Sequence, residues 1–128
     1  MYDISFDDRT QELEQILNEL KESVKEIDAC AVVSIEGLPI AANMPDIYDD
    51  TIVAAMTSAM LTLGEKIATN LRRGSLNKVS VEGVDGQVIS QAAGTNAVLT
   101  ISASKEAKLG LIFMEMDKAT QKIASLLG

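Results

Sequence analysis

The segment from Asp46 to Arg73 constrains the fold most, because it is the longest helical pattern in the chain and lies between two sets of strand-like segments. At 100° per residue its large apolar side chains gather on one arc, which is the stripe expected of a helix that lies on a sheet. This stripe comprises Ile52, Met56, Ala59, Met60, Leu63, Ile67 and Leu71. The pattern predicts a long helix that contacts a sheet through the stripe.

A second row of mostly small side chains runs beside the stripe at steps of three and four residues. Small side chains let another helix backbone come close, so this row predicts contact with a partner helix. The alternative is that the small residues only fill the helix surface, since such residues are common. The row consists of Ala54, Thr57, Leu61, Gly64, Ala68 and Leu71.

A first amphipathic helix is predicted from about residue 8 to residue 27, because apolar residues recur there at helical spacing. Its other face is rich in glutamate and lysine, which is typical of a solvated surface. Three side chains near its start have an oxygen that could cap the helix, namely Ser5, Asp8 and Thr10.

Two strands are predicted between this helix and the long one. Residues 30–35 are apolar on both alternating faces, which indicates a central strand covered on both sides. Gly37 allows a tight turn into a second strand at residues 38–43, and Pro39 places that strand at an edge because it lacks an N–H donor. One of three acids, Asp46, Asp49 or Asp50, is expected to cap the long helix.

Three more strands are predicted after the long helix, at residues 76–82, 87–93 and 97–104. Asp85-Gly86 is a strong hairpin signal between the first two. The polar residues Lys78, Ser80 and Glu82 alternate with valine, which favours an edge strand, whereas 97–104 is uncharged and should be central.

The tail from about residue 105 to residue 127 has apolar residues at steps of three and four and predicts a third helix, although its run LGLIFM could instead extend the last strand. The predicted topology is α-β-β-α-β-β-β-α. It forms an α+β sandwich with a five-stranded antiparallel sheet in the order 2-1-5-4-3 and helices on both faces. Residues 1–128 contain no linker and no repeat, so they are expected to form a single domain.

Charge and composition argue against several partners. A net charge of -8 opposes binding to nucleic acid and to anionic membrane surfaces, because long-range attraction would have the wrong sign. Aromatic residues make up 3% of the chain, too few for stacking platforms that bind sugars or bases. We therefore expect neither nucleic-acid binding nor membrane insertion.

The chain lacks the residues of most catalytic and metal sites. It has no His and one cysteine, Cys30, so His-based proton transfer and the usual soft metal sites are absent, and no glycine-rich phosphate loop occurs. Adjacent acids at Asp7-Asp8 and Asp49-Asp50 lie at predicted helix starts, where capping explains them. We expect no catalytic residue, no metal, no cofactor and no enzymatic activity.

Two further features bear on location. Residues 1–8 carry three Asp and no apolar core of a secretory signal, and no apolar run approaches membrane-spanning length. Cys30 lies in an apolar run, so its side chain is expected to be buried in the core. It has no second cysteine to pair with, which is typical of a protein from a reducing compartment. The sequence therefore predicts a cytoplasmic protein.

The order of elements, together with several local phrases, resembles the Roadblock family of dynein light chains and its prokaryotic relatives, which include regulators of Ras-like small GTPases. The matching features are VVSIEGLPIAA at residues 32–42, the long Ala-rich helix, and AKLGLIFMEMDKATQKI at residues 107–123. The resemblance covers nearly the whole chain and implies a profilin-like sandwich.

The resemblance also implies a dimer, homotypic or heterotypic, in which the long helices of two subunits pack together and the third strands pair edge to edge. On this chain the small-residue row and the strand at 76–82 provide that surface. The predicted dimer interface is Ala54, Thr57, Leu61, Gly64, Ala68, Val79 and Val81.

Similar proteins act as non-enzymatic platforms that bind and regulate a small GTPase, and some accelerate its hydrolysis. Exposed positions along the long helix are the predicted GTPase-facing residues. They are Ser58, Thr62, Glu65, Thr69 and Arg72. Arg72 and Arg73 lie at a helix end, where they suit the helix dipole better than the role of an arginine finger.

Two other functions stay open at this point. A small-molecule sensor could use an adaptable pocket lined by methionines, although the same methionines could fill gaps in a core that has few aromatic residues. These residues are Met44, Met56, Met60, Met114 and Met116. A structural subunit of a larger assembly would need no site of its own.

Overall fold

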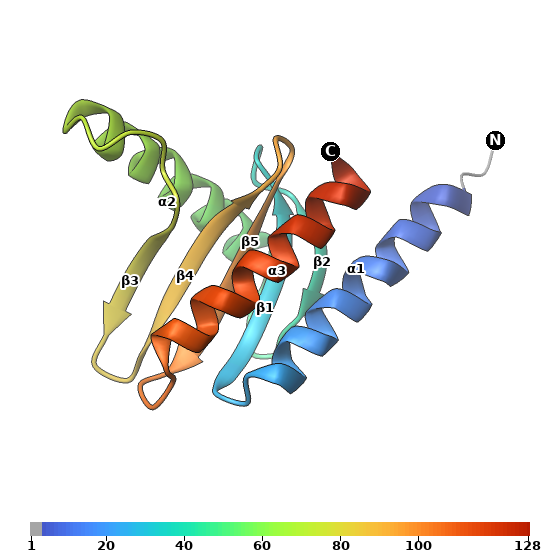
Figure 1. The fold of residues 1–128 in the computed structure, drawn as a ribbon. Helices are drawn as coiled ribbons and strands as arrows, with labels where there is room; N and C mark the ends of the chain where they lie inside the picture. The colour runs from blue at the N-terminus through green and yellow to red at the C-terminus, as the bar shows by residue number, and fades with distance from the viewer. Residues whose placement is uncertain (1–3) are drawn as a thin grey trace.

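The computed structural model describes residues 4–128, and the elements of this part of the chain surround one antiparallel sheet (Figure 1). The elements are α1 (Ile4–Ser23), β1 (Ile27–Ser34), β2 (Pro39–Asn43), α2 (Asp50–Asn70), β3 (Val79–Gly83), β4 (Gly86–Ala93), β5 (Ala97–Ser104) and α3 (Leu109–Leu127). Their order confirms the predicted α-β-β-α-β-β-β-α topology.

The strand order is β2-β1-β5-β4-β3, as predicted. Neighbouring strands pair in antiparallel fashion throughout, and β2 and β3 form the two edges. Helices α1 and α3 lie side by side on one face of the sheet, and α2 crosses the opposite face (Figure 1). Both faces of the central strands are therefore covered.

Alternation along the central strands divides the core into two parts. Val32 of β1 faces the larger part beneath α1 and α3, and Ala31 and Val33 face the smaller part beneath α2. The uncharged β5 contributes Leu99 to the larger part and Val98 to the smaller one. A strand that is buried on both sides needs apolar residues at odd and even positions, which explains the predicted central strands.

Several predicted boundaries shift. The first helix ends at Ser23 rather than near residue 27, and Ile27 begins β1, where it is buried in the larger core. Two of its proposed caps, Ser5 and Asp8, lie outside the residues whose side chains are described, and Thr10 lies inside the helix. The run LGLIFM belongs to α3, so the alternative that it extends the last strand is wrong.

The turn between β4 and β5 holds the end of α3. Thr95 donates its backbone N–H to the carbonyl oxygen of Gly128 over 3.0 Å, and the Asn96 side chain donates to the carbonyl of Leu127 over 3.1 Å. The backbone N–H of Ile35, next to β1, donates to the carbonyl of Asn96 over 3.2 Å. This turn therefore connects the end of α3 with the β1–β2 hairpin.

The two ends of α2 are fixed differently. Of the three candidate acids Asp49 is the N-cap, and its side chain accepts from the backbone N–H groups of Thr51 (2.9 Å) and Ile52 (3.3 Å). At the other end Arg73 N–H donates to Ala68 O over 2.7 Å, which completes a Schellman motif. Its left-handed position, usually glycine, is occupied by Arg72 with φ 57°.

Replacing Arg72 with glycine is expected to raise the free energy of unfolding of the monomer by about 0.5–1 kcal/mol, because glycine adopts a positive φ without the Cβ penalty. Urea unfolding at a concentration where both proteins are monomeric measures the change. Arg73→Gly is the matched control and should not stabilise, because φ is positive at Arg72 and not at Arg73. Equal effects of the two substitutions would contradict this explanation.

Candidate interaction surface

The structure reverses the predicted roles of the two faces of α2. The small-residue row faces the chain's own sheet, and Ala54, Thr57, Leu61 and Gly64 are the buried residues of this helix. The prediction that this row forms a dimer interface is therefore wrong for these four buried residues. The predicted stripe points away from the sheet except at Met60, which is half-buried with its sulfur 4.0 Å from the hydroxyl oxygen of Ser90 on β4. Ala68 is half-buried on the same side, whereas Leu71, the last residue of the row, is 65% exposed.

Close packing explains why small residues lie beneath α2. A Cβ added at Gly64 would come within 3.1 Å of Leu76 Cδ2 and 3.3 Å of Val79 Cβ, so the helix and the start of β3 approach each other too closely for a side chain. Val79, a predicted interface residue, is half-buried and packs on the smaller core. Val81, two residues further along β3, is 57% exposed and stays available to a partner.

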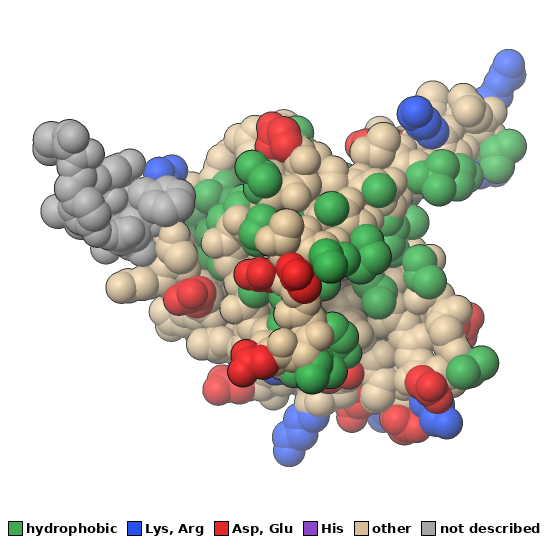
Figure 2. All heavy atoms as spheres, turned by 180° about the vertical axis from the view of Figure 1, so that it is seen from behind, with side chains coloured by type: hydrophobic (Ala, Val, Ile, Leu, Met, Phe, Trp, Pro, Cys, Tyr) green, Lys and Arg blue, Asp and Glu red, His purple; other side chains and the backbone are tan. Residues whose placement is uncertain are grey.

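Most of the large apolar side chains of α2 point away from the sheet, whereas Leu61 is buried beneath the helix. Five of the outward-facing side chains are between 51% and 65% exposed, although such residues are normally buried. We call this set the apolar stripe, which consists of Ile52, Met56, Leu63, Ile67 and Leu71. Figure 2 shows the face that carries α2, where hydrophobic side chains gather along the helix. A contiguous apolar surface of this kind is typical of a protein–protein interface.

The open edge of the sheet adjoins this region. Within residues 4–128, β3 pairs with β4 alone, so its other side offers unpaired backbone N–H and C=O groups. Val81 of β3 lies opposite Val88 of β4, and both side chains are exposed on the α2 side of the sheet. The surface therefore combines an apolar helix, two exposed valines and an unpaired strand.

The predicted GTPase-facing residues lie on the other flank of α2. Thr62, Glu65 and Thr69 are exposed, whereas Ser58 is half-buried and donates its hydroxyl hydrogen to the carbonyl of Ile35 over 2.7 Å. We call these four residues the polar flank. Arg72 is exposed but lies beyond the last helical turn, at the charged end of the helix.

A polar cluster connects α3 to the sheet on the face opposite α2. This cluster was not predicted from the sequence. Asp117 accepts hydrogen bonds from Gln91 Nε2 (2.9 Å) and Lys78 Nζ (3.0 Å), and Lys78 Nζ lies 5.2 Å from the centre of the Phe113 ring. The hydrogen bond from Gln91, and then that from Lys78, lower the pKa of Asp117 below its ordinary 3.8.

The lowered pKa gives a signed pH dependence. When the pKa of a carboxylate is lower in the folded than in the unfolded protein, the ionised group stabilises the fold. This stabilisation is fully present at pH values above the pKa of the unfolded state, and it is lost as the pH falls through the pKa of the folded state. The fall in urea midpoint between pH 6 and pH 3 should therefore be smaller for Asp117→Asn than for the natural chain. Glu65→Gln is the control, and an equal pH dependence of all three proteins would contradict the role of Asp117.

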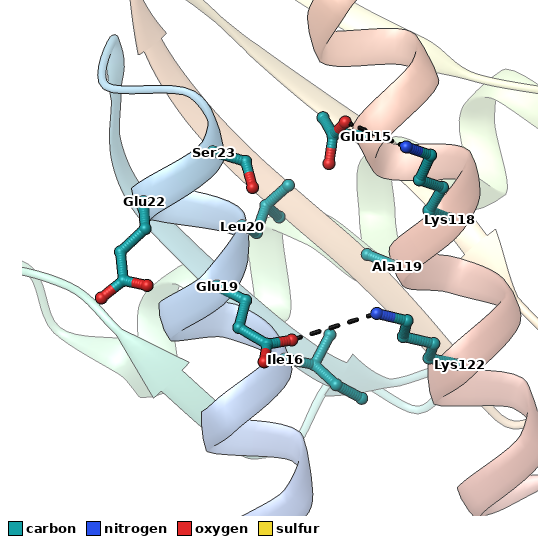
Figure 3. A pocket seen from close by; sticks show the side chains of 9 residues that line it. All are labelled: Ile16, Glu19, Leu20, Glu22, Ser23, Glu115, Lys118, Ala119 and Lys122. Carbon is teal, nitrogen blue, oxygen red and sulfur yellow. Dashed lines mark hydrogen bonds and ion pairs between the residues drawn. The ribbon is translucent and has the colours of Figure 1, made fainter.

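A shallow groove of about 410 Å³ lies between α1 and α3 (Figure 3). Its walls carry ion pairs, Glu19 with Lys122 at 3.9 Å and Lys118 with Glu115 at 3.4 Å. Small-molecule sites are usually lined mostly by apolar side chains, so this groove does not favour the sensor alternative. The five methionines do not line it either, since Met116 is buried in the core and Met56 and Met114 are exposed on different helices.

Cys30 is buried, as expected, and its thiol donates to the carbonyl of Leu17 at 3.6 Å. Burial raises its pKa to about 12, so the thiol stays protonated and unreactive. Among the residues that the structure describes, no group of three possible ligands could hold a metal ion. No helix in the same part of the chain is long and apolar enough to cross a membrane.

Comparison with known proteins agrees with this architecture. The model of the Roadblock/LC7 domain family matches residues 12–103. An uncharacterized protein of Methanocaldococcus jannaschii is 31% identical over 114 residues, which is 89% of this chain and 98% of that protein.

Solved structures show the same fold. A Roadblock/LC7 domain from Streptomyces avermitilis superposes with a TM-score of 0.84 at 21% identity, covering 89% of this chain and 96% of that one. MglB from Myxococcus xanthus has a TM-score of 0.84 at 17% identity, with 99% and 92% covered. Profilin II from Acanthamoeba castellanii has a TM-score of 0.57 at 15% identity, with 84% and 90% covered, which agrees with the predicted profilin-like sandwich.

Proposed function

Because the chain belongs to the Roadblock/LC7 family, we propose that it is a dimeric, non-catalytic platform that binds and regulates a Ras-like small GTPase in the cytoplasm. The single observation that supports the platform best is the exposed apolar stripe of α2. Five large side chains at 51% to 65% exposure are unfavourable in water, and pairing with a second subunit would remove them from solvent.

The proposed dimer uses the stripe together with the free edge of β3. A stable interface buries about 800 Å² on each partner, which is more than one helical stripe provides. Pairing two β3 edges would add backbone hydrogen bonds and bring Val81 into the interface, because edge strands readily accept another strand. The two sheets would then become continuous, with both α2 helices on the same face.

The GTPase is proposed to dock on the polar flank, which the dimer would leave free. Thr62, Glu65 and Thr69 are exposed there. Effects on hydrolysis would come from positioning the GTPase's own catalytic groups, since orientation and electrostatic stabilisation dominate phosphoryl transfer. No residue of this chain needs to enter the nucleotide site.

Nucleotide-dependent binding tests the proposal. Each Ras-like GTPase of the same cell is loaded with GDP or a non-hydrolysable GTP analogue, and its affinity for the natural chain is measured alongside its hydrolysis rate. We expect one GTPase to bind more tightly in one nucleotide state, and Thr62→Arg to weaken that binding. Gln121→Arg, on the exposed side of α3, is the control. Equal or absent binding in both states would contradict a regulatory role and favour a structural subunit.

A further inference from the structure

Ser75 lies in a short sequence motif that the proposed function does not use. Residues 71–76 have the sequence LRRGSL, so arginines stand three and two residues before the serine and a leucine follows it. A serine kinase whose substrate groove carries carboxylates selects this pattern, because the carboxylates pair with the two guanidinium groups. An apolar pocket beside the groove accepts the residue after the serine. The motif therefore indicates a site of covalent modification.

This pattern occurs once in the chain. Two of the chain's three arginines are Arg72 and Arg73, and Ser75 is the one Ser or Thr with a cation both three and two residues before it. Thr69 and Ser125 have a lysine three residues before them, but they lie inside α2 and α3. Kinases bind the substrate segment in an extended form, which a residue inside a helix does not offer. Ser75 is therefore the hydroxyl that such a kinase would select.

The segment around Ser75 is locally basic. Residues 66–81 contain four cations and no acid, in a chain whose net charge is -8. The cations are Lys66, Arg72, Arg73 and Lys78. Figure 2 shows Lys and Arg side chains at the projecting end of α2, to which this segment belongs. A phosphate group on Ser75 would be stabilised there, because its oxygens accept charge-assisted hydrogen bonds from arginine.

Ser75 is accessible in the folded chain. It lies in the irregular connector at residues 71–78, which joins α2 to β3 at a corner of the molecule (Figure 1). Ser75 is exposed, and within residues 4–128 its hydroxyl makes no hydrogen bond. A Cβ added at the neighbouring Gly74 would meet no atom within 4 Å. The ion pairs found in the same residues involve neither Arg72 nor Arg73, so both guanidinium groups are open to a kinase.

The end of α2 must open for the arginines to enter an extended groove. The backbone N–H of Arg72 donates to Thr69 O over 3.1 Å, and that of Arg73 donates to Ala68 O over 2.7 Å. Arg72 has a φ of 57°, which costs free energy that a glycine would avoid, so this cap opens more easily than one with glycine. Opening also releases the half-buried Leu76 from the smaller core. A role in recognition would explain an arginine at a position that costs stability.

We propose that Ser75 is phosphorylated by a serine kinase that recognises Arg72 and Arg73, with a nucleoside triphosphate as the phosphoryl donor. The hydroxyl oxygen of Ser75 forms a bond to the γ-phosphorus, and the bond from that phosphorus to the oxygen shared with the β-phosphate breaks. The nucleoside diphosphate leaves with the electron pair, and the hydroxyl proton passes to a carboxylate of the kinase.

The phosphate would act on the proposed dimer, because Ser75 lies between α2 and β3, the two elements of that interface. Two β3 edges related by a two-fold axis run antiparallel, so the start of each lies beside the end of the other, near Glu82 and Asp85. The unmodified connector brings cations toward these acids, whereas a phosphoserine adds a charge of about -1.5 to -2. Phosphorylation is therefore inferred to weaken self-association. This effect rests on the proposed dimer, and the modification site does not.

Labelling in an extract of the protein's own cells tests the site. The purified chain is incubated with the extract, phosphatase inhibitors and ATP labelled in its γ-phosphate. We expect the natural chain to be labelled and Ser75→Ala not to be. The double variant Arg72→Gln, Arg73→Gln should incorporate label about 10-fold more slowly, because it loses two charge-assisted contacts to the kinase. Ser125→Ala is the matched control and should be labelled like the natural chain, since Ser125 is exposed and also follows a lysine.

Three results would overturn the site. They are an unlabelled natural chain, equal labelling of the natural chain and Ser75→Ala, and equal labelling of the natural chain and the double arginine variant. Circular dichroism of the variants checks that each one is folded, and peptide mapping by mass spectrometry identifies the residue that carries the phosphate.

Sedimentation equilibrium of the modified chain tests the effect. Chain phosphorylated on Ser75 should have a dissociation constant about 5-fold higher than the unmodified chain at low salt, and phosphatase treatment should restore the lower value. The difference should shrink at high salt, because exposed charges are screened. An unchanged dissociation constant would overturn the effect and leave the site and the dimer standing. A chain that is monomeric with and without the phosphate would overturn the proposed dimer and leave the site standing.

Discussion

Leu63→Asp is expected to weaken self-association at least 100-fold, because a carboxylate in the middle of an apolar interface loses its hydration, and the two-fold axis introduces it twice. Leu63 is 59% exposed in the single chain, so its replacement leaves the fold unaffected. Sedimentation equilibrium of the natural chain and the variant measures the dissociation constants, and circular dichroism checks the fold.

Thr62→Asp provides the matched control. It introduces the same charge one residue away, on the polar flank, and Thr62 is also exposed. Its dissociation constant should stay within about threefold of the natural one, as expected for a surface substitution. If Leu63→Asp dimerised as well as Thr62→Asp, the apolar stripe would not be the interface.

Gly64→Leu is expected to lower the free energy of unfolding by about 2 kcal/mol, within the range for overpacking a filled core. Even a Cβ at this position would press on Leu76 and Val79 at 3.1–3.3 Å, and a leucine adds three more carbons. Urea unfolding in the Leu63→Asp background measures the effect on the single chain without a contribution from the dimer.

Thr62→Leu in the same background is the control, because it adds a leucine to the exposed side of α2. Its free energy of unfolding should change by less than about 0.5 kcal/mol. A Gly64→Leu variant that unfolds like the control but dimerises poorly would restore the sequence-based assignment of this row to a partner helix.

Local signals in the sequence were sufficient to predict the topology. Asp85-Gly86 specified a hairpin that the structure contains, with Gly86 at φ 157°. Pro39 placed β2 at an edge, and the absence of charge placed β5 at the centre. Each of these signals is a constraint on backbone conformation or burial that acts over a few residues, which is why one sequence reveals it.

The contacts of α2 could not be predicted in the same way. The helix is apolar around more than half of its circumference, and periodicity alone does not tell which apolar arc meets the sheet. The orientation of α2 is decided by the close approach of β3 to the helix. At Gly64 there is room for a glycine and not for a larger residue. The distance between α2 and β3 depends on where the chain places β3 after the helix. The spacing of residues within α2 contains no information about that position.

The polar cluster at Asp117 was missed for a related reason. Asp117 is 39 residues from Lys78 and 26 from Gln91 along the chain, so no local pattern connects them. Gln91 lies between Ile89 and Ala93 on the same face of β4, and a polar residue between two buried apolar ones was the available signal. A buried N–H donor needs an acceptor, and Asp117 of α3 accepts from Gln91 Nε2.

The backbone N–H and C=O groups of Ile35 form hydrogen bonds that connect them to the helical layers on both faces of the sheet. The N–H of Ile35 is bonded to the turn that holds the end of α3, and its carbonyl accepts from Ser58 on α2. Amide hydrogen exchange requires local opening, so the exchange rates of Ile35 and Thr95 should respond together to events on either layer. A partner bound over α2 would then slow exchange at Thr95, on the far side of the sheet, without touching it.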